Sequence, residues 1–230
     1  MTTTQQQRIM VSSGALPSDG LSRFVRAGAW AAMVSGLALV VSMLLAWLVV
    51  PYERLGLTEA YLSISYSLSS GLRLLGLVLL VWGLIGIYGP QSRVAGTFGL
   101  WAFVVVFLCS ALAVGNVWAE VFVYPTLAQI APDMLSGAGF ETEAAYMSAG
   151  LSMSYPLFFL GLILFAAATF WAGVYPRWIA LLLIVSVPVT VFLDPTAGTF
   201  QESIGPALWG VAVAAYGFYA LRRGSSTTSS

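Results

Sequence analysis

Seven polar side chains interrupt the long apolar stretches of this sequence, where a polar group needs a structural or a chemical reason. They are Arg73, Asn116, Glu120, Tyr155, Ser186, Thr190 and Asp194. An arginine beside a carboxylate forms a charge-assisted pair, and hydroxyl and amide groups around such a pair can hold a small polar ligand. The same pair can instead do nothing more than hold helices together. For catalysis, only Glu120 with Asp194 offers a candidate acid pair.

Several kinds of chemistry are excluded by composition. The chain of 230 residues contains no histidine and no lysine, and its single cysteine is Cys109. Histidine-ligated metal or haem, histidine-based triads, lysine Schiff bases, intramolecular disulfides and CxxC sites therefore cannot occur. We expect no metal and no cofactor. The net charge is zero and no basic cluster is present, so nucleic acid is not an expected partner.

The elements that carry or directly precede the seven side chains are membrane spans. Hydrophobic residues make up 59% of the chain, charged residues only 8%, and the mean hydropathy is +0.90. A soluble protein has roughly a quarter charged residues, so this sequence predicts an all-α, polytopic bundle in a lipid bilayer. Six spans are predicted, at about 27–50, 71–88, 94–118, 151–172, 178–193 and 207–221. They form one transmembrane domain over 23–223, with disordered tails at 1–22 and 224–230.

The boundaries follow from turn residues and prolines. The first span is too long for the apolar part of a signal peptide, so we expect it to be retained. Pro125 is expected to end the third span, and Pro206 to stand in the first turn of the sixth. Residues 126–149 are predicted to be the longest loop. Between 51 and 70, an apolar face favours an interfacial helix over 57–68, although the alternating serines also fit a strand.

Charge placement predicts the orientation of the bundle. With both termini in the cytoplasm, seven of the nine arginines lie inside and eight of the nine acids lie outside or at outer helix ends. Arg93, Arg177, Arg222 and Arg223 are the anchors at the inner ends of the predicted spans. The protein is thus expected to be a multi-pass protein of the cell (inner) membrane. Three inward-running spans also end alike, with Gly-x-Tyr before an arginine, which fits either a helix-hairpin duplication or the same interfacial selection repeated.

Depth in the membrane suggests which charges meet. Counting from the inner helix ends at about 1.5 Å per residue places Arg73 about 24 Å and Asp194 about 26 Å above the inner face. Asn116 and Glu120 come out at about 35 and 40 Å, at or beyond the outer boundary of a core of about 30 Å. We therefore predict that Arg73 pairs with Asp194. Glu120 or Asn116 comes within reach if the arginine extends outward.

Polar stripes surround this predicted pair. Ser186, Thr190 and Asp194 are spaced four apart on one helical face, and Pro188 between them frees a backbone carbonyl. Asn116 and Glu120 form a similar stripe with Tyr124, and Tyr155 stands near the start of the fourth span. Together these stripes predict a polar cavity that opens outward in the outer third of the bundle.

A strip of small residues on the first span offers a different use of the bundle. Gly28, Ala32 and Gly36 recur every four residues, a spacing that permits close helix–helix packing. Besides the lipid bilayer, expected partners are therefore membrane helices of other proteins or further copies of this chain. The sequence leaves two main functions open: handling of a small ligand, lipid or solute in the outer cavity, or a non-catalytic accessory or scaffold role. A membrane enzyme is a third possibility with no motif to support it.

Two short motifs carry a resemblance. The turn Gly173-x-x-Pro176-Arg177-Trp178, together with the stretch Trp118–Pro132, resembles a broad set of uncharacterised bacterial six-helix membrane proteins. The resemblance spans roughly Arg23–Arg223. It implies a bacterial inner-membrane location and supports the six-helix architecture, and because it implies no known activity it supplies no catalytic residues to carry over.

Overall fold

The computed structural model describes residues 18–50, 52–135, 145–192 and 200–226, and within these ranges it contains helices and no strands. In chain order the elements are α2 (Ser18–Leu48), α3 (Tyr52–Tyr61), α4 (Ile64–Tyr88), the 3₁₀ turn η1 (Gly89–Gln91), α5 (Gly96–Ile130), the 3₁₀ turn η2 (Pro132–Leu135), α7 (Ala145–Ala172), α8 (Arg177–Phe192) and α9 (Phe200–Ser226). The all-α prediction is confirmed for these residues.

Five of these helices are long and apolar enough to cross a membrane. Their candidate spans are Ser22–Leu48, Ile64–Gln91, Gly96–Ile130, Ser152–Ala172 and Ile204–Arg223. The sixth apolar helix, α8, has only 16 residues, a length of about 24 Å at 1.5 Å per residue. These are the features of a multi-pass membrane protein, whereas a count of six spans stays a prediction.

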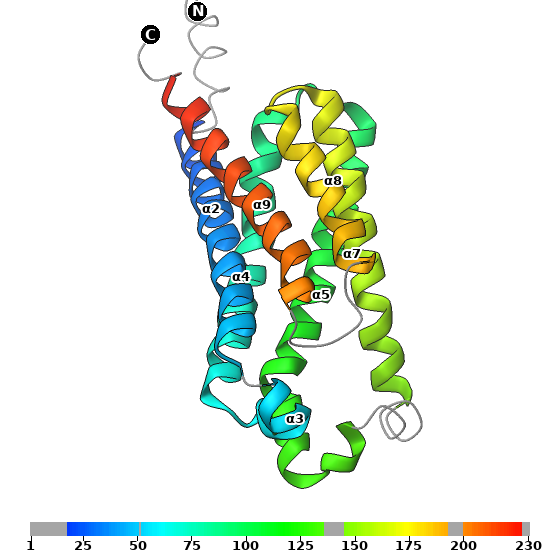
Figure 1. Ribbon diagram of the computed structural model, residues 1–230. Coiled ribbons are helices and arrows are strands. Elements are labelled where there is room, and N and C mark those ends of the chain that lie inside the picture. The colour runs from blue at the N-terminus through cyan, green and yellow to red at the C-terminus, as the bar shows by residue number, and fades with distance from the viewer. Residues whose placement is uncertain (1–17, 51, 136–144, 193–199, 227–230) are drawn as a thin grey trace, which may run out of the picture.

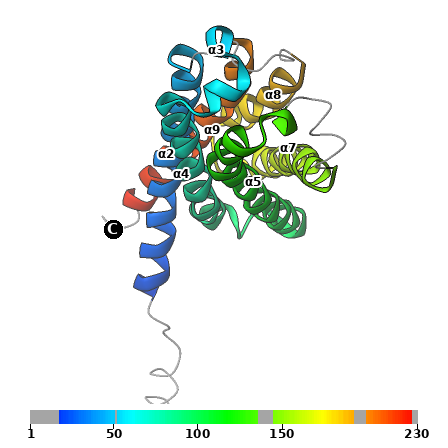
Figure 2. The same ribbon diagram turned by 90° about the horizontal axis from the view of Figure 1, so that it is seen from below.

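The six apolar helices form a closed ring in chain order. Each packs against the next along the chain, from α2 to α4, α5, α7, α8 and α9, and α9 returns to pack against α2 (Figure 2). The start of α2 and the end of α9 lie at the same end of the bundle, and α3 lies at the opposite end (Figure 1). Ring closure places buried side chains of all six helices in one shared core.

Small residues allow α2 to approach two helices closely. A Cβ added to Gly86 of α4 would lie 2.1 Å from the backbone nitrogen of Ala29, and one added to Gly36 would lie 2.3 Å from the carbonyl oxygen of Gly210 on α9. Gly28 likewise faces Gly86. The predicted small-residue strip is thus used inside the chain, against α4 and α9, and is not presented to an outside helix.

The predicted boundaries at two prolines, at one loop and at the N-terminal tail are wrong. Pro125 lies inside α5, which continues to Ile130, and Pro206 lies inside α9, which begins at Phe200. A proline removes one backbone hydrogen bond but need not end a helix whose side chains remain packed. The helical continuation of α5 also shortens the loop predicted over 126–149 at its start. At the N-terminus, α2 begins at Ser18, within the segment predicted as a tail.

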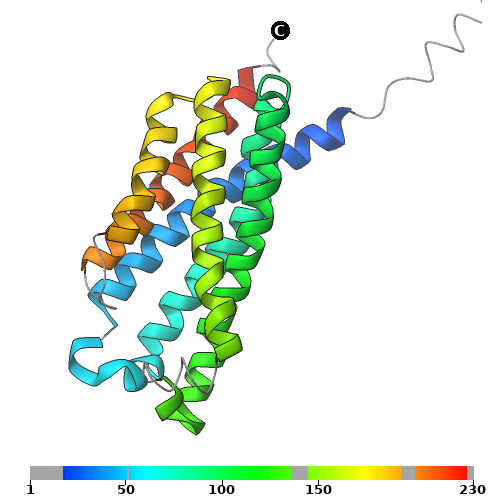
Figure 3. The ribbon, with the colours of Figure 1, turned by 90° about the vertical axis from the view of Figure 1, so that its right-hand side faces the viewer.

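The segment between the first two spans is helical, and the strand alternative is wrong for its described residues. It is divided between α3 and the start of α4, because Ser63 caps α4 by accepting a hydrogen bond from the backbone N–H of Tyr66 at 3.2 Å. Within α3, Gly56 has a φ of 77°, which bends the helix. The bend and the cap together set α3 across the end of the bundle, as Figure 3 shows.

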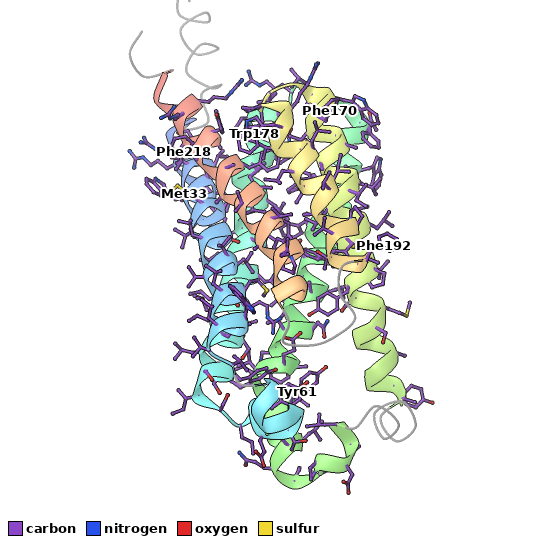
Figure 4. The ribbon with its side chains drawn as sticks, viewed as in Figure 1. Met33, Tyr61, Phe170, Trp178, Phe192 and Phe218 are labelled. Carbon is purple, nitrogen blue, oxygen red and sulfur yellow. The ribbon has the colours of Figure 1, made fainter. Side chains whose placement is uncertain are left out.

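At the opposite end, polar contacts join the turns. The hydroxyl of Tyr175, in the turn between α7 and α8, donates to the carbonyl oxygen of Ile87 at 2.7 Å. Burial raises the pKa of Tyr175, so its hydroxyl keeps the proton that this bond needs. Arg177 lies over the Phe170 ring and Arg222 over the Phe218 ring, and Figure 4 labels both rings at this end. Arg93 is exposed beyond η1, and Arg223 lies in the last turn of α9.

Candidate functional site

A cavity of about 420 Å³ lies in the half of the bundle nearer α3. Seven elements contribute to its wall: α2, α3, α4, α5, α7, the end of α8 and the start of α9. Figure 4 labels Tyr61, which reaches the cavity from α3. The lining side chains are Met43, Tyr61, Tyr66, Arg73, Leu77, Ala113, Val117, Glu120, Tyr124, Tyr155, Phe158, Phe159, Thr190, Pro206 and Trp209.

An ion pair forms the polar part of this wall. The guanidinium of Arg73, on α4, donates to Oε2 of Glu120 on α5. The other carboxylate oxygen, Oε1, accepts a hydrogen bond from the Tyr155 hydroxyl of α7 at 2.6 Å. The Tyr66 hydroxyl donates to the backbone carbonyl of Glu120 at 3.1 Å. Glu120 therefore ties α4, α5 and α7 together at one level of the bundle.

The side chains explain why Arg73 reaches Glu120 although the depth count separates them. A helical side chain leans toward the N-terminus of its own helix. Because α4 begins at the α3 end, Arg73 leans toward that end, whereas α5 begins at the far end and Glu120 leans back toward Arg73. Counting backbone positions leaves out this convergence. The other predicted partner, Asp194, lies outside the described residues, so its pairing with Arg73 stays a prediction.

Aromatic rings make up the rest of the wall. Tyr61 contacts Tyr66 edge-on at 4.9 Å between ring centroids and lies 5.5 Å from Tyr124. On the other side, Phe158 and Trp209 meet edge-to-face at 5.6 Å. All of these rings supply flat apolar surface, and the tyrosines add a polar hydroxyl group at the ring edge. A wall of this kind suits an amphipathic molecule.

Some of the predicted site residues line the cavity and others do not. Arg73, Glu120, Tyr155 and Thr190 line the cavity. Asn116 and Ser186 are buried beside it without lining it, and the Ser186 hydroxyl donates to the carbonyl of Leu183 at 2.7 Å. The Asn116 side-chain nitrogen has no hydrogen-bond partner within the described chain.

Sequence reasoning missed part of the wall. Tyr61, Tyr66 and Trp209 were not among the predicted cavity residues, although all three line it. Aromatic residues near predicted helix ends are typical of the membrane interface, and nothing in a linear sequence separates an interfacial ring from a ring that faces a cavity. A signal was present in the serine-rich segment around Tyr66, which is too polar for a face that contacts lipid.

The arrangement supports binding more directly than covalent chemistry. Within the described ranges, no three His, Cys, Asp or Glu residues gather where they could hold a metal ion. Cys109 is buried on α5, away from the cavity lining. What the site offers is one compensated charge pair, several hydroxyl groups and an aromatic wall.

Comparison with known proteins finds no matching family model, no significantly similar curated protein and no significantly similar solved structure. The resemblance to bacterial six-helix membrane proteins therefore stays an expectation from two short motifs. Any function must be argued from the cavity itself.

Proposed function

We propose that this membrane protein binds a small amphipathic ligand, lipid or solute in the cavity around Arg73 and Glu120. The observation that carries the proposal is the cavity of about 420 Å³ with a hydrogen-bonded charge pair in an aromatic wall. Its volume lies in the range of small-molecule sites, roughly 300–1,000 Å³. A bundle that needed only packing would fill such a space with side chains.

The scaffold alternative loses the docking strip expected on α2, whereas its other argument, the lack of a chemical signature, is unchanged. Gly28, Ala32 and Gly36 were the surface expected to receive a partner helix, and they contact α4 and α9 of the same chain instead. The closed ring of helices gives the ligand proposal a firmer base, because it surrounds the cavity on several sides.

Filling the cavity is expected to abolish ligand binding without unfolding the bundle. Ala113 is fully buried and lines the cavity, so Ala113→Leu places three further carbon atoms in that space. The measurement is the rise in melting temperature of the purified protein across a broad lipid and metabolite panel. Compounds that raise the melting temperature of the wild type should leave that of Ala113→Leu unchanged.

The matched control is Leu112→Trp, which adds volume to the adjacent residue of α5 on its exposed face. It should bind like the wild type. The proposal is refuted if no compound in the panel stabilises the wild type, or if Ala113→Leu responds as the wild type does.

We further propose that the chain crosses the cell (inner) membrane six times with both termini in the cytoplasm. The inward placement of arginines supports this orientation, and the start of α2 and the end of α9 lie at the same end of the bundle (Figure 1). An even number of crossings requires α8 to count as a span, despite its 16 residues. A short span can be accommodated by local thinning of the bilayer.

Cysteine labelling is expected to place α3 outside. In a Cys109→Ala background, Glu59→Cys should react with a membrane-impermeant maleimide on intact spheroplasts. Ser92→Cys, in the turn between α4 and α5, should react only after permeabilisation. Both positions are exposed, so access to reagent rather than burial decides the result. The reverse labelling pattern would show that the bundle is inverted.

A further inference from the structure

We infer that the cavity is selective for an uncharged aromatic compound that donates hydrogen bonds, that is, a phenol with an apolar substituent. The inference rests on the proposed function, since it names the class of ligand for the same cavity. Three observations lead to it: the direction of the cavity hydroxyl groups, the balance of charge and the chemistry of the wall.

Three hydroxyl groups in the cavity wall donate hydrogen bonds to acceptors of the protein itself. Tyr155 donates to Glu120 Oε1 at 2.6 Å, Tyr66 donates to the Glu120 carbonyl at 3.1 Å, and Thr190 donates to the Ser186 carbonyl at 2.8 Å. A hydroxyl group has one proton and two acceptor lone pairs. Once the proton is committed, what the group can still offer a ligand is an acceptor. These three hydroxyl groups therefore favour a ligand that donates, and the guanidinium of Arg73 is a donor in the same wall.

The charge of the wall favours an uncharged ligand. Among the described lining residues, the charged side chains are Arg73 and Glu120, which form an ion pair. An anion would face Glu120 and a cation would face Arg73, whose side chain is 25% exposed. In an apolar bundle, an added charge without a partner is costly. An aromatic ammonium ion, which the rings alone would suit, is therefore disfavoured.

The wall also favours a ring. Phe158, Phe159 and the tyrosines contribute flat aromatic surface, while Leu77, Val117 and Met43 add aliphatic surface. Trp209 carries an N–H donor, but this nitrogen is covered by protein atoms and has no hydrogen-bond partner within the described ranges. It therefore offers no donor to a ligand. A phenol meets both conditions, since its ring contacts the aromatic residues and its hydroxyl group donates at the rim.

The test compares four probes of matched size and different chemistry on the purified full chain. They are hexylresorcinol, its dimethyl ether, para-hexylbenzoate and para-hexylbenzylammonium, titrated by calorimetry in one detergent. The alkyl chain is common to all four, and each titration is corrected with the measured partition coefficient of the probe, because the dimethyl ether partitions more strongly into micelles. We expect hexylresorcinol to bind at least about tenfold more tightly than its dimethyl ether, as about one lost hydrogen bond predicts.

Variants assign the preference to the cavity. Thr190→Val removes an acceptor with little change of volume. It should weaken the binding of hexylresorcinol several-fold and leave the binding of the dimethyl ether unchanged. The control is Thr126→Val on α5, whose hydroxyl donates to a carbonyl one turn back, as that of Thr190 does, but lies outside the cavity lining.

Two results would overturn the inference: equal binding of hexylresorcinol and its dimethyl ether, or tighter binding of the charged probes. If none of the four probes binds while other compounds bind in a manner blocked by Ala113→Leu, the phenol class is wrong and the cavity remains a binding site. If nothing binds and Ala113→Leu changes nothing, the proposed function itself fails.

Discussion

Replacing Arg73 with methionine is expected to destabilise the bundle by about 3 kcal/mol, because Glu120 is then left as a largely buried carboxylate with Tyr155 as its remaining side-chain partner. Glu120→Gln should cost less, since a glutamine oxygen can still accept from Tyr155. The double variant Arg73→Met/Glu120→Gln should recover much of the loss, because no unpaired charge remains. Unfolding of the purified protein in mixed micelles gives the free energies for this double-mutant cycle.

Controls decide whether the pair itself is responsible. Arg93→Met removes an exposed arginine beyond η1 and should change stability by less than about 0.5 kcal/mol. Additive effects of the Arg73 and Glu120 substitutions would contradict the importance of their contact. A second cycle, Arg73→Met with Asp194→Asn, tests the pairing predicted from depth. Coupling in both cycles would mean that Arg73 is shared between two carboxylates.

Gly86→Ala is expected to destabilise the protein by at least about 2 kcal/mol, a large effect for one methyl group. The new Cβ would lie 2.1 Å from the backbone nitrogen of Ala29 and 2.2 Å from the carbonyl carbon of Gly28. Backbone atoms cannot rotate away as a flexible side chain can, so α2 and α4 must separate. Because α2 also packs on α9, the separation should weaken the closure of the ring.

Gly115→Ala is the matched control on α5, where an added Cβ meets nothing within 4 Å. It should leave stability unchanged or raise it slightly, because alanine favours a helix more than glycine does. Thermal unfolding in detergent compares the two variants directly. If Gly86→Ala is as stable as the wild type, α2 and α4 do not approach as closely as the structure places them.

Local sequence features were reliable where they depended on composition. The apolar runs predicted the helices, and the charge pattern predicted an arrangement in which arginines gather at helix ends, as Arg177 and Arg222 do. They were unreliable where packing overrides local preference. Pro125 was expected to end a helix and Pro206 to stand in a first helical turn, but each lies farther inside a packed helix.

For the candidate site as well, the sequence identified several residues but not their contacts. Arg73, Glu120, Tyr155 and Thr190 could be selected from the sequence, because polar groups inside apolar helices are rare and expensive. The partner of Arg73 could not be selected, because a count along the backbone gives the height of a Cα atom and not the direction of a side chain. Arg73 and Glu120 meet because α4 and α5 are antiparallel and their side chains lean toward each other.

By itself, the sequence determined that this is an apolar membrane protein, helical in its described residues, without histidine, lysine or paired cysteine chemistry, since these properties depend on which residues are present and on how the apolar ones are grouped in runs. Tertiary structure alone decided that the small residues of α2 are used within the chain, and that Tyr61, Tyr66 and Trp209 face the same cavity as Glu120. The physical reason is that both properties depend on which helix lies beside which. That neighbourhood is set by closure of the ring, through contacts between residues such as Gly36 and Gly210 that lie far apart in the chain.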